Sequence, residues 1–134
     1  MPGVGKVEFC RKAGYPNLRN TVWSWGATSD EGSVLLLVWE DDSTTLDKGI
    51  QRVWVWGSSP SDSEPGGAER REHLDRISAG AQGVVAFCTS NDRSHARIDS
   101  INEVLFRVVE VEKPDSAGRV HVIAWHPKRG GSAP

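Results

Sequence analysis

Residues 21–42 read TVWSWGATSDEGSVLLLVWEDD, and this stretch decides the predicted fold. Larger and smaller side chains alternate around Trp23 and Trp25, and a dense apolar run follows at 34–39. The intervening segment 28–33 (TSDEGS) has the composition of a short hairpin loop, in which a glycine supplies a positive φ. We therefore expect a β-hairpin. Because successive strand side chains point to opposite faces, Trp23 and Trp25 should lie side by side.

The second strand of this hairpin is apolar on both faces, which is typical of a strand inside a closed barrel or sandwich. Its last residue, Trp39, is followed at once by Glu40, Asp41 and Asp42. Aromatic faces next to hydrogen-bond acceptors suit a planar ligand that carries an amino group. This strand end is the most informative feature for function.

The rest of the chain adds further strands and one helix. The helix is expected at about 68–79, where Leu74 and Ile77 follow helical spacing and Gly80 supplies a stop. Strands are expected at 4–10, 50–57, 82–88, 101–112 and 120–125. The order implies an α+β, mostly β fold, namely a curved β-barrel of six to seven strands with one principal helix packed across an end.

The length of 134 residues indicates a single domain, expected at 1–127, followed by a flexible basic tail at 128–134. Apolar residues make up 37% and charged residues 25%, as in ordinary soluble proteins. No run approaches the roughly 20 apolar residues that cross a bilayer, and the first residues lack the apolar core of a signal peptide. We therefore expect a cytoplasmic location.

The cysteines and histidines do not predict a metal site. Cys10 and Cys88 lie far apart, and the four histidines are scattered without ligand spacing. The two cysteines are expected to be buried thiols, and no cofactor is expected.

Charge excludes a strong nonspecific nucleic-acid binder, because the formal net charge is -2. The charges are segregated along the chain, however, so a basic face remains open beside the alternative of a mixed solvated surface. Cations and a stacking ring that suit phosphate and base contacts occur in the loop after residue 10 and in the polar segment after residue 88, at Arg11, Lys12, Tyr15, Arg19, Arg93 and Arg97.

No nucleophile motif is present, and a catalytic site would have to combine His73, Glu69 and the 40–42 carboxylates. The acidic cluster is also compatible with magnesium-dependent nuclease chemistry. The helix places Glu69, Arg70 and His73 close to one another, either aimed at a ligand or tying the helix to the barrel. Both roles remain open at this point.

Recognition chemistry fits the residues better. Six tryptophans exceed what packing ordinarily requires, so one or two are expected to line a site. Trp25 and Trp39 are the candidate stacking faces for a nucleobase, and Asp41 is the candidate acceptor for its exocyclic amine.

The patterns WSWGA at 23–27, VLLLVWED at 34–41 and ERREH at 69–73 resemble a group of small bacterial proteins of the PUA superfamily, which includes the SRA-type readers of methylated DNA. Among these, the nearest in function are actinobacterial proteins that bind DNA carrying methylcytosine. The resemblance covers about residues 20–125 and implies a PUA/SRA-like barrel with a pocket for a modified base and no catalysis. The matching positions are Trp23, Ser24, Trp25, Trp39, Asp41, Glu69, Arg70 and His73.

The expected function is thus a non-catalytic, nucleoid-associated reader of duplex DNA containing 5-methylcytosine. Its predicted base pocket is Trp23, Ser24, Trp25, Trp39, Asp41, Arg70 and His73. The acid- and proline-rich loop at 58–67 and the low net charge depart from the family's pattern. The alternatives are an RNA-binding PUA-like module, a metal-dependent nuclease or component of a modification-dependent restriction system, and a small-molecule sensor.

Overall fold

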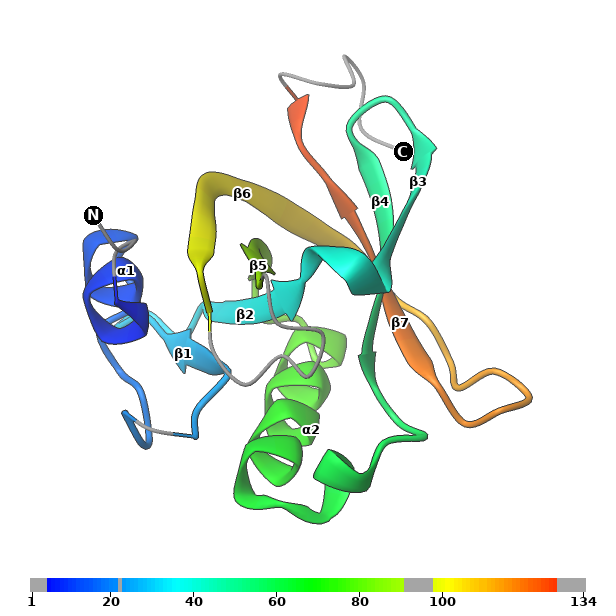
Figure 1. Cartoon of the computed structure of the whole chain (residues 1–134), viewed down its shortest axis with the longest axis horizontal. Helices are drawn as coiled ribbons and strands as arrows, with labels where there is room; N and C mark the ends of the chain where they lie inside the picture. The colour runs from blue at the N-terminus through cyan, green and yellow to red at the C-terminus, as the bar shows by residue number, and fades with distance from the viewer. Residues whose placement is uncertain (1–4, 22, 91–97, 128–134) are drawn as a thin grey trace.

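The computed structural model describes residues 5–21, 23–90 and 98–127, and within them one seven-stranded mixed sheet carries two α-helices (Figure 1). The helices are α1 Lys6–Lys12 and α2 Pro65–Ser78. Two 3-10 turns, η1 and η2, span Glu40–Asp42 and Pro60–Ser63. The strands are β1 Gly26–Thr28, β2 Val34–Trp39, β3 Ser43–Asp47, β4 Ile50–Trp56, β5 Gly83–Thr89, β6 Ser100–Val111 and β7 Val120–Trp125. The predicted mostly β, α+β class is confirmed.

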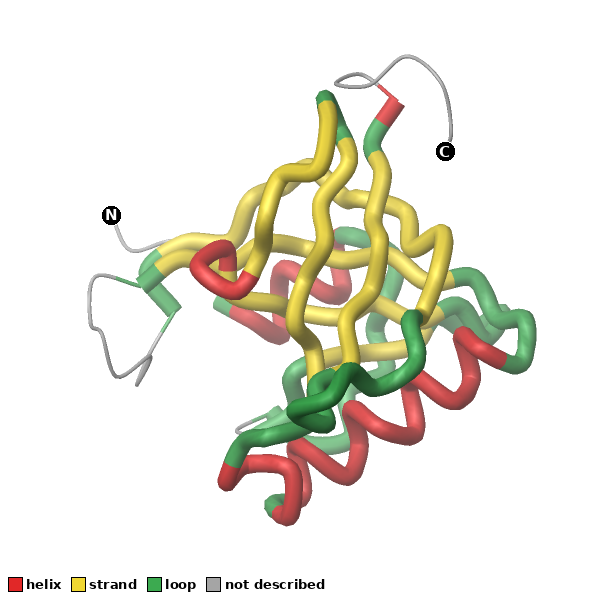
Figure 2. Tube along the Cα trace, turned by 90° about the vertical axis from the view of Figure 1, so that its right-hand side faces the viewer, coloured by secondary structure: helices red, strands yellow, loops and turns green. Residues whose placement is uncertain are grey.

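The strand order is β1-β2-β5-β6-β7-β4-β3, and every pair is antiparallel except β2 with β5. The chain reaches this parallel partner through α2, which directly precedes β5. The sheet curves strongly (Figure 2), yet its edge strands β1 and β3 do not pair with each other. The predicted closed barrel is therefore wrong, and the sheet is open.

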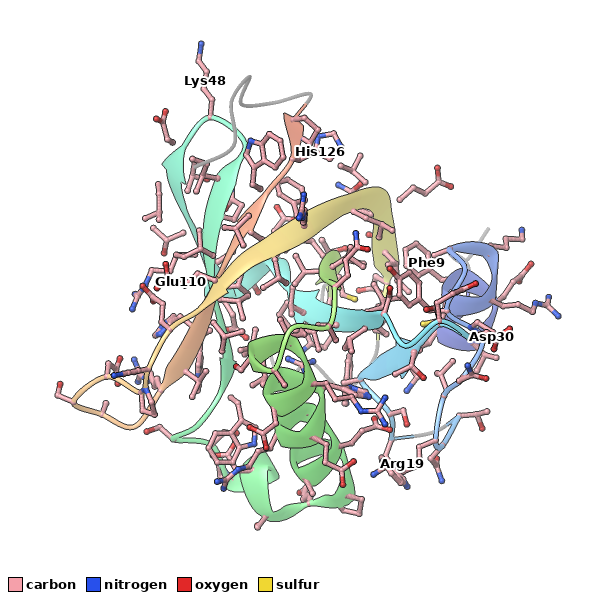
Figure 3. The ribbon with its side chains drawn as sticks, turned by 180° about the vertical axis from the view of Figure 1, so that it is seen from behind. Phe9, Arg19, Asp30, Lys48, Glu110 and His126 are labelled. Atoms are coloured by element: carbon pink, nitrogen blue, oxygen red, sulfur yellow. The ribbon has the colours of Figure 1, made fainter. Side chains whose placement is uncertain are left out.

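Two apolar cores lie on opposite faces of the sheet. Val34, Leu36 and Val38 of β2 join Leu74 of α2 in one core, while Leu35 and Leu37 join the second. The second core also contains Phe9 and Cys10 of α1, and Figure 3 labels Phe9 on that helix. A helix on each side explains why β2 is apolar on both faces without a closed barrel.

The segment predicted as a strand at 4–10 forms helix α1 from Lys6 onward. Val7 and Phe9 imitate strand alternation, but Phe9 and Cys10 are buried together while Val7 is 40% exposed. An ion pair from Lys12 Nζ to Glu8 Oε1, one turn apart at 3.2 Å, further suits the helix.

Three further boundaries differ from expectation. Trp23 and Trp25 precede the short β1 and do not lie within a strand. The polar segment Ser43–Asp47 forms edge strand β3, where no strand was expected. Helix α2 begins at Pro65, because proline is well suited to the first helical position. No helix among the described residues is long and apolar enough to cross a membrane.

Candidate ligand-binding site

One candidate site is a cavity of about 680 Å³, within the usual range for small-ligand pockets. Of the six tryptophans in the chain, it is lined by Trp23, Trp25, Trp39, Trp54 and Trp56. These rings come from the segment before β1, from the end of β2 and from β4. We call this space the tryptophan cavity.

Trp25 and Trp39 form a packed pair in the cavity wall. Their ring centroids lie 5.3 Å apart with planes tilted by 54°. Both rings also pack against the core beneath α1, and the Nζ atom of Lys6 lies 5.3 Å from the centroid of Trp25. The pair is therefore supported from behind, while each ring remains half-buried and borders the cavity.

Hydrogen bonds hold the rings of Trp54 and Trp56 in place. The Nε1 atom of Trp54 donates to the carbonyls of Trp56 (3.1 Å) and Gly57 (2.9 Å), and Nε1 of Trp56 donates to the carbonyl of Gly67 (3.0 Å). Half-buried indole rings whose N–H groups have fixed acceptors cannot reorient freely, so this wall is preformed.

The site role of Trp54 and Trp56 was missed from the sequence, although a signal was present. The sequence WVWG at 54–57 repeats the form WSWG at 23–26. In both copies the glycine allows another segment of backbone to approach closely. A Cβ at Gly26 would lie 2.7 Å from the carbonyl oxygen of Leu35, and Gly57 has a positive φ of 92°.

Arg70 of α2 lies at the tryptophan cavity and joins its three walls. Its Nη2 donates to the carbonyls of Trp25 (3.0 Å) and Leu37 (2.6 Å), and its Nη1 donates to the carbonyl of Val55 (3.1 Å). The side chain is 9% exposed, and its Nε has no hydrogen-bond partner.

Burial lowers the pKa of Arg70 to about 10, so the guanidinium stays charged at neutral pH. Electrostatic interactions with Cys88, Glu69 and Asp42 act in the opposite direction. A buried cation therefore adds positive potential to a mostly aromatic space. Of the two roles left open for Arg70, the structural tie is present, and the same side chain also borders the cavity.

Carboxylates complete the cavity lining. Asp62 accepts hydrogen bonds from the backbone N–H groups of Gly57 (3.2 Å) and Ser59 (3.1 Å), and so fixes the loop after β4. Asp42 is half-buried at the end of η1 and borders the cavity, whereas the predicted acceptor Asp41 is exposed and does not. The 3-10 turn reorients these side chains relative to a continuing strand. Of the carboxylates predicted at this strand end, Asp42 and not Asp41 therefore borders the cavity.

Ser24 and His73 do not reach the tryptophan cavity. Ser24 is fully buried, and its Oγ donates to Oε2 of Glu69 at 3.3 Å. His73 borders a second space of about 360 Å³, the polar cavity, whose ionisable lining residues are Arg19, Glu69, Glu72, His73 and Arg76. The predicted pocket is thus divided, with Trp23, Trp25, Trp39 and Arg70 on one cavity and His73 on the other.

Burial dominates the electrostatics of the polar cavity. It lowers the pKa of His73 to about 4, aided by the positive charges of Arg70, Arg76 and Arg19. It also raises the pKa of Glu69, against the hydrogen bond from Ser24 and the charge of Arg19. The Nδ1 atom of His73 is buried without a hydrogen-bond partner. The histidine is therefore neutral at physiological pH.

The residues predicted to contact phosphates are separated in space. Arg11 and Lys12 are exposed on α1, and Tyr15 is half-buried against the core beneath that helix. Arg19, labelled in Figure 3, lies beside α2, where its Nη2 pairs with Oε2 of Glu72 at 2.5 Å and its Nε lies 3.8 Å from Glu69 Oε2. Arg93 and Arg97 fall outside the described residues.

The groups considered for catalysis are also separated. Glu69 and His73 border the polar cavity, and Asp42 borders the tryptophan cavity. Within the described parts of the chain, no group of three or more histidine, cysteine or acidic side chains is arranged to hold a metal ion. Cys10 and Cys88 are free buried thiols, as predicted, and burial raises their pKa values to about 11 and about 12.

Comparison of the chain with protein-family models, curated proteins and solved structures finds no match. The geometry of the site combines aromatic stacking faces, a buried cation and a nearby carboxylate.

Proposed function

We propose that this protein is a non-catalytic reader of modified DNA that takes one extruded base, 5-methylcytosine, into the tryptophan cavity. The observation that carries this proposal is the aromatic lining of a 680 Å³ space with Arg70 and Asp42 at its wall. Such a reader would work on the bacterial nucleoid in the cytoplasm. Within the same proposal, a PUA/SRA-like relationship rests on the motifs at 23–27, 34–41 and 69–73 together with the mostly β, strongly curved sheet.

The energetics of base capture favour such a cavity. Extruding a base costs a few kcal/mol, and stacking on an aromatic side chain returns about 1–3 kcal/mol per base. The carboxylate of Asp42 supplies an acceptor for the exocyclic amine, and the charge of Arg70 favours the carbonyl side of the base. Burying the 5-methyl group contributes about 0.8 kcal/mol, which corresponds to roughly fourfold preference over unmodified cytosine.

The test is a binding titration at one near-physiological salt concentration, with duplexes that are unmodified or carry 5-methylcytosine or 6-methyladenine. We expect tightest binding to 5-methylcytosine. Trp39→Leu should weaken that binding by about 5- to 150-fold, the equivalent of one lost stack of 1–3 kcal/mol. Trp125→Leu is the matched control, because Trp125 lies on β7 and does not border the cavity.

Other outcomes would favour the alternative functions. Equal binding to all three duplexes would leave phosphate attraction alone, and displacement by structured RNA would favour an RNA-binding module. Cleavage of the duplex that stops on addition of a chelator would favour a metal-dependent nuclease. Equal losses in the Trp39 and Trp125 variants would remove the tryptophan cavity from the mechanism.

A second candidate function, a sensor for a small organic cation, is favoured by the carboxylates of Asp42, Asp62 and Glu64 at the same cavity. Aromatic walls with nearby carboxylates recognise quaternary ammonium groups through cation–π attraction. Choline and trimethyllysine, tested by quenching of tryptophan fluorescence, distinguish this candidate from a base reader. Saturable quenching without any duplex binding would favour the sensor.

A further inference from the structure

Two arginines lie over tryptophan rings that border the tryptophan cavity. The Cζ atom of Arg71 is 5.4 Å from the ring centroid of Trp56, and the Cζ atom of Arg119 is 5.0 Å from that of Trp54. Arg71 comes from α2, while Arg119 directly precedes β7. The antiparallel register of Trp56 with Val120 explains how the second arginine reaches β4. We call Arg71 and Arg119 the stacked arginines.

Both stacked arginines are exposed, and neither forms an ion pair within the described parts of the chain. Two other arginines differ in this respect. Arg19 pairs with Glu72, and Nε of Arg52 pairs with Oε1 of Glu112 at 2.8 Å. The positive charges of Arg19 and Arg52 are therefore largely neutralised locally, whereas no carboxylate of the described residues lies within ion-pair distance of Arg71 or Arg119.

Stacking also orders the guanidinium groups. The ring of Trp54 is fixed by its bonds to the carbonyls of Trp56 and Gly57, and the ring of Trp56 by its bond to Gly67. A guanidinium held over a fixed aromatic face keeps its N–H donors at its edge, where they can form paired hydrogen bonds to a phosphate. The stacked arginines are thus pre-oriented for an anion beside the cavity.

We propose that Arg71 and Arg119 bind the backbone phosphates that flank the base held in the tryptophan cavity. This inference rests on the function proposed above and identifies how the DNA strand is held. A base cannot enter the cavity without bringing its own two phosphates to the cavity's surroundings. The carboxylates of Asp62 and Glu64 border the same cavity and repel phosphate there. The DNA backbone is therefore directed to the stacked arginines.

The test uses Arg71→Gln, Arg119→Gln and the double variant, titrated with modified and unmodified duplexes over a range of salt concentrations. Each substitution should weaken binding on the order of tenfold and reduce the slope of log K against log salt by about 0.9. The ratio of affinities for modified and unmodified duplex should not change, because a phosphate contact carries no base information.

Arg107→Gln is the matched control. Arg107 is exposed on β6 and lies opposite Trp125, which also pairs with Ile50 at the far end of β4 from Trp56. Its loss should leave both affinity and salt slope unchanged. Arg71→Lys and Arg119→Lys should restore most of the salt slope, since they keep the positive charge.

A substitution in the DNA makes the test independent of protein folding. Neutral methylphosphonates at the two phosphates flanking the modified base should weaken binding to the wild-type protein as strongly as the double variant does. The same DNA should bind the double variant with no further loss, because both changes remove the same contacts.

Two results would overturn the phosphate contacts while leaving the reader function intact. One is a double variant with the salt slope of the wild type, and the other is fully additive losses when methylphosphonate DNA is bound by the double variant. Failure of the wild-type protein to bind any duplex would overturn both proposals. Loss of discrimination with an unchanged salt slope would show that the stacked arginines only shape the cavity, and would overturn the inference as well.

Discussion

Arg70 is a buried cation whose hydrogen-bond partners are backbone carbonyls of Trp25, Leu37 and Val55. Each of these carbonyls belongs to a different wall of the tryptophan cavity. These three hydrogen bonds leave Nε of Arg70 without a partner, yet they fix the distance between walls that the chain brings from separate segments. The residue therefore links the integrity of the cavity to the stability of the fold.

Replacing Arg70 by methionine should lower the free energy of unfolding by about 2–4 kcal/mol, because three carbonyls each lose one donor at a buried side chain. Urea unfolding of the wild type and of Arg70→Met measures the difference. Arg71→Met, at the next and exposed position, is the control and should change stability by less than about 0.5 kcal/mol. Equal stabilities of Arg70→Met and wild type would refute the tie.

At the scale of single residues, the aromatic and cationic character of the site was predictable and its exact membership was not. Trp23, Trp25, Trp39 and Arg70 do border one cavity. Asp41 does not, because η1 turns the chain directly after β2 and brings Asp42 to the cavity. A one-residue shift of this kind depends on turn geometry that adjacency along the sequence does not encode.

Helix α2 approaches the start of β1 so closely that a side chain is excluded there. A Cβ on Gly26 would lie 2.7 Å from the carbonyl oxygen of Leu35 and 2.9 Å from Nδ1 of His73. The helix separates the two cavities at this point, with Arg70 on one side and His73 on the other. The glycine of WSWG is thus required by packing between elements.

Gly26→Ala should therefore lower the free energy of unfolding by about 1–3 kcal/mol, since the backbone of β2 must move to admit the methyl group. Thermal or urea unfolding gives the value. Gly83→Ala offers a comparison, because its nearest neighbours are side-chain atoms of Ile77 and not backbone atoms. A larger loss at position 83 than at position 26 would contradict this explanation.

At the scale of elements, patterns with a long apolar run were predicted well. Strands β2, β4, β5, β6 and β7 lie within a residue or two of their expected places. Helix α1 was missed because Val7 and Phe9 alternate as in a strand, and β3 because an edge strand needs no apolar face. The open sheet was missed because a helix on each face produces the same apolar run as a closed barrel.

At the scale of the whole molecule, His73 makes stability depend on pH. Its pKa is about 4 in the folded protein against an ordinary 6.5. Between these values the unfolded chain binds more protons than the folded one, so the free energy of unfolding falls as the pH drops from 6.5 to 4. The loss is at most about 3 kcal/mol, and the raised pKa of Glu69 partly offsets it in acid.

Urea midpoints measured from pH 7 to pH 4 check this expectation. The wild type should lose stability steadily below pH 6.5, and His73→Gln should show a shallower dependence over the same interval. Parallel curves for the two proteins would assign the acid sensitivity to other groups. Near-neutral pH is therefore the appropriate condition for every binding test above.

The order of strands in the sheet has a consequence for biosynthesis. The cavity is lined by residues between 23 and 70, yet β2 and β4 are held apart in the sheet by β5, β6 and β7. At about 5–20 residues per second, a ribosome needs roughly 3 to 11 s to add residues 71–125. During that interval the nascent chain carries five indole rings with no completed sheet to receive them, which makes it a client for chaperones that shield aromatic surface.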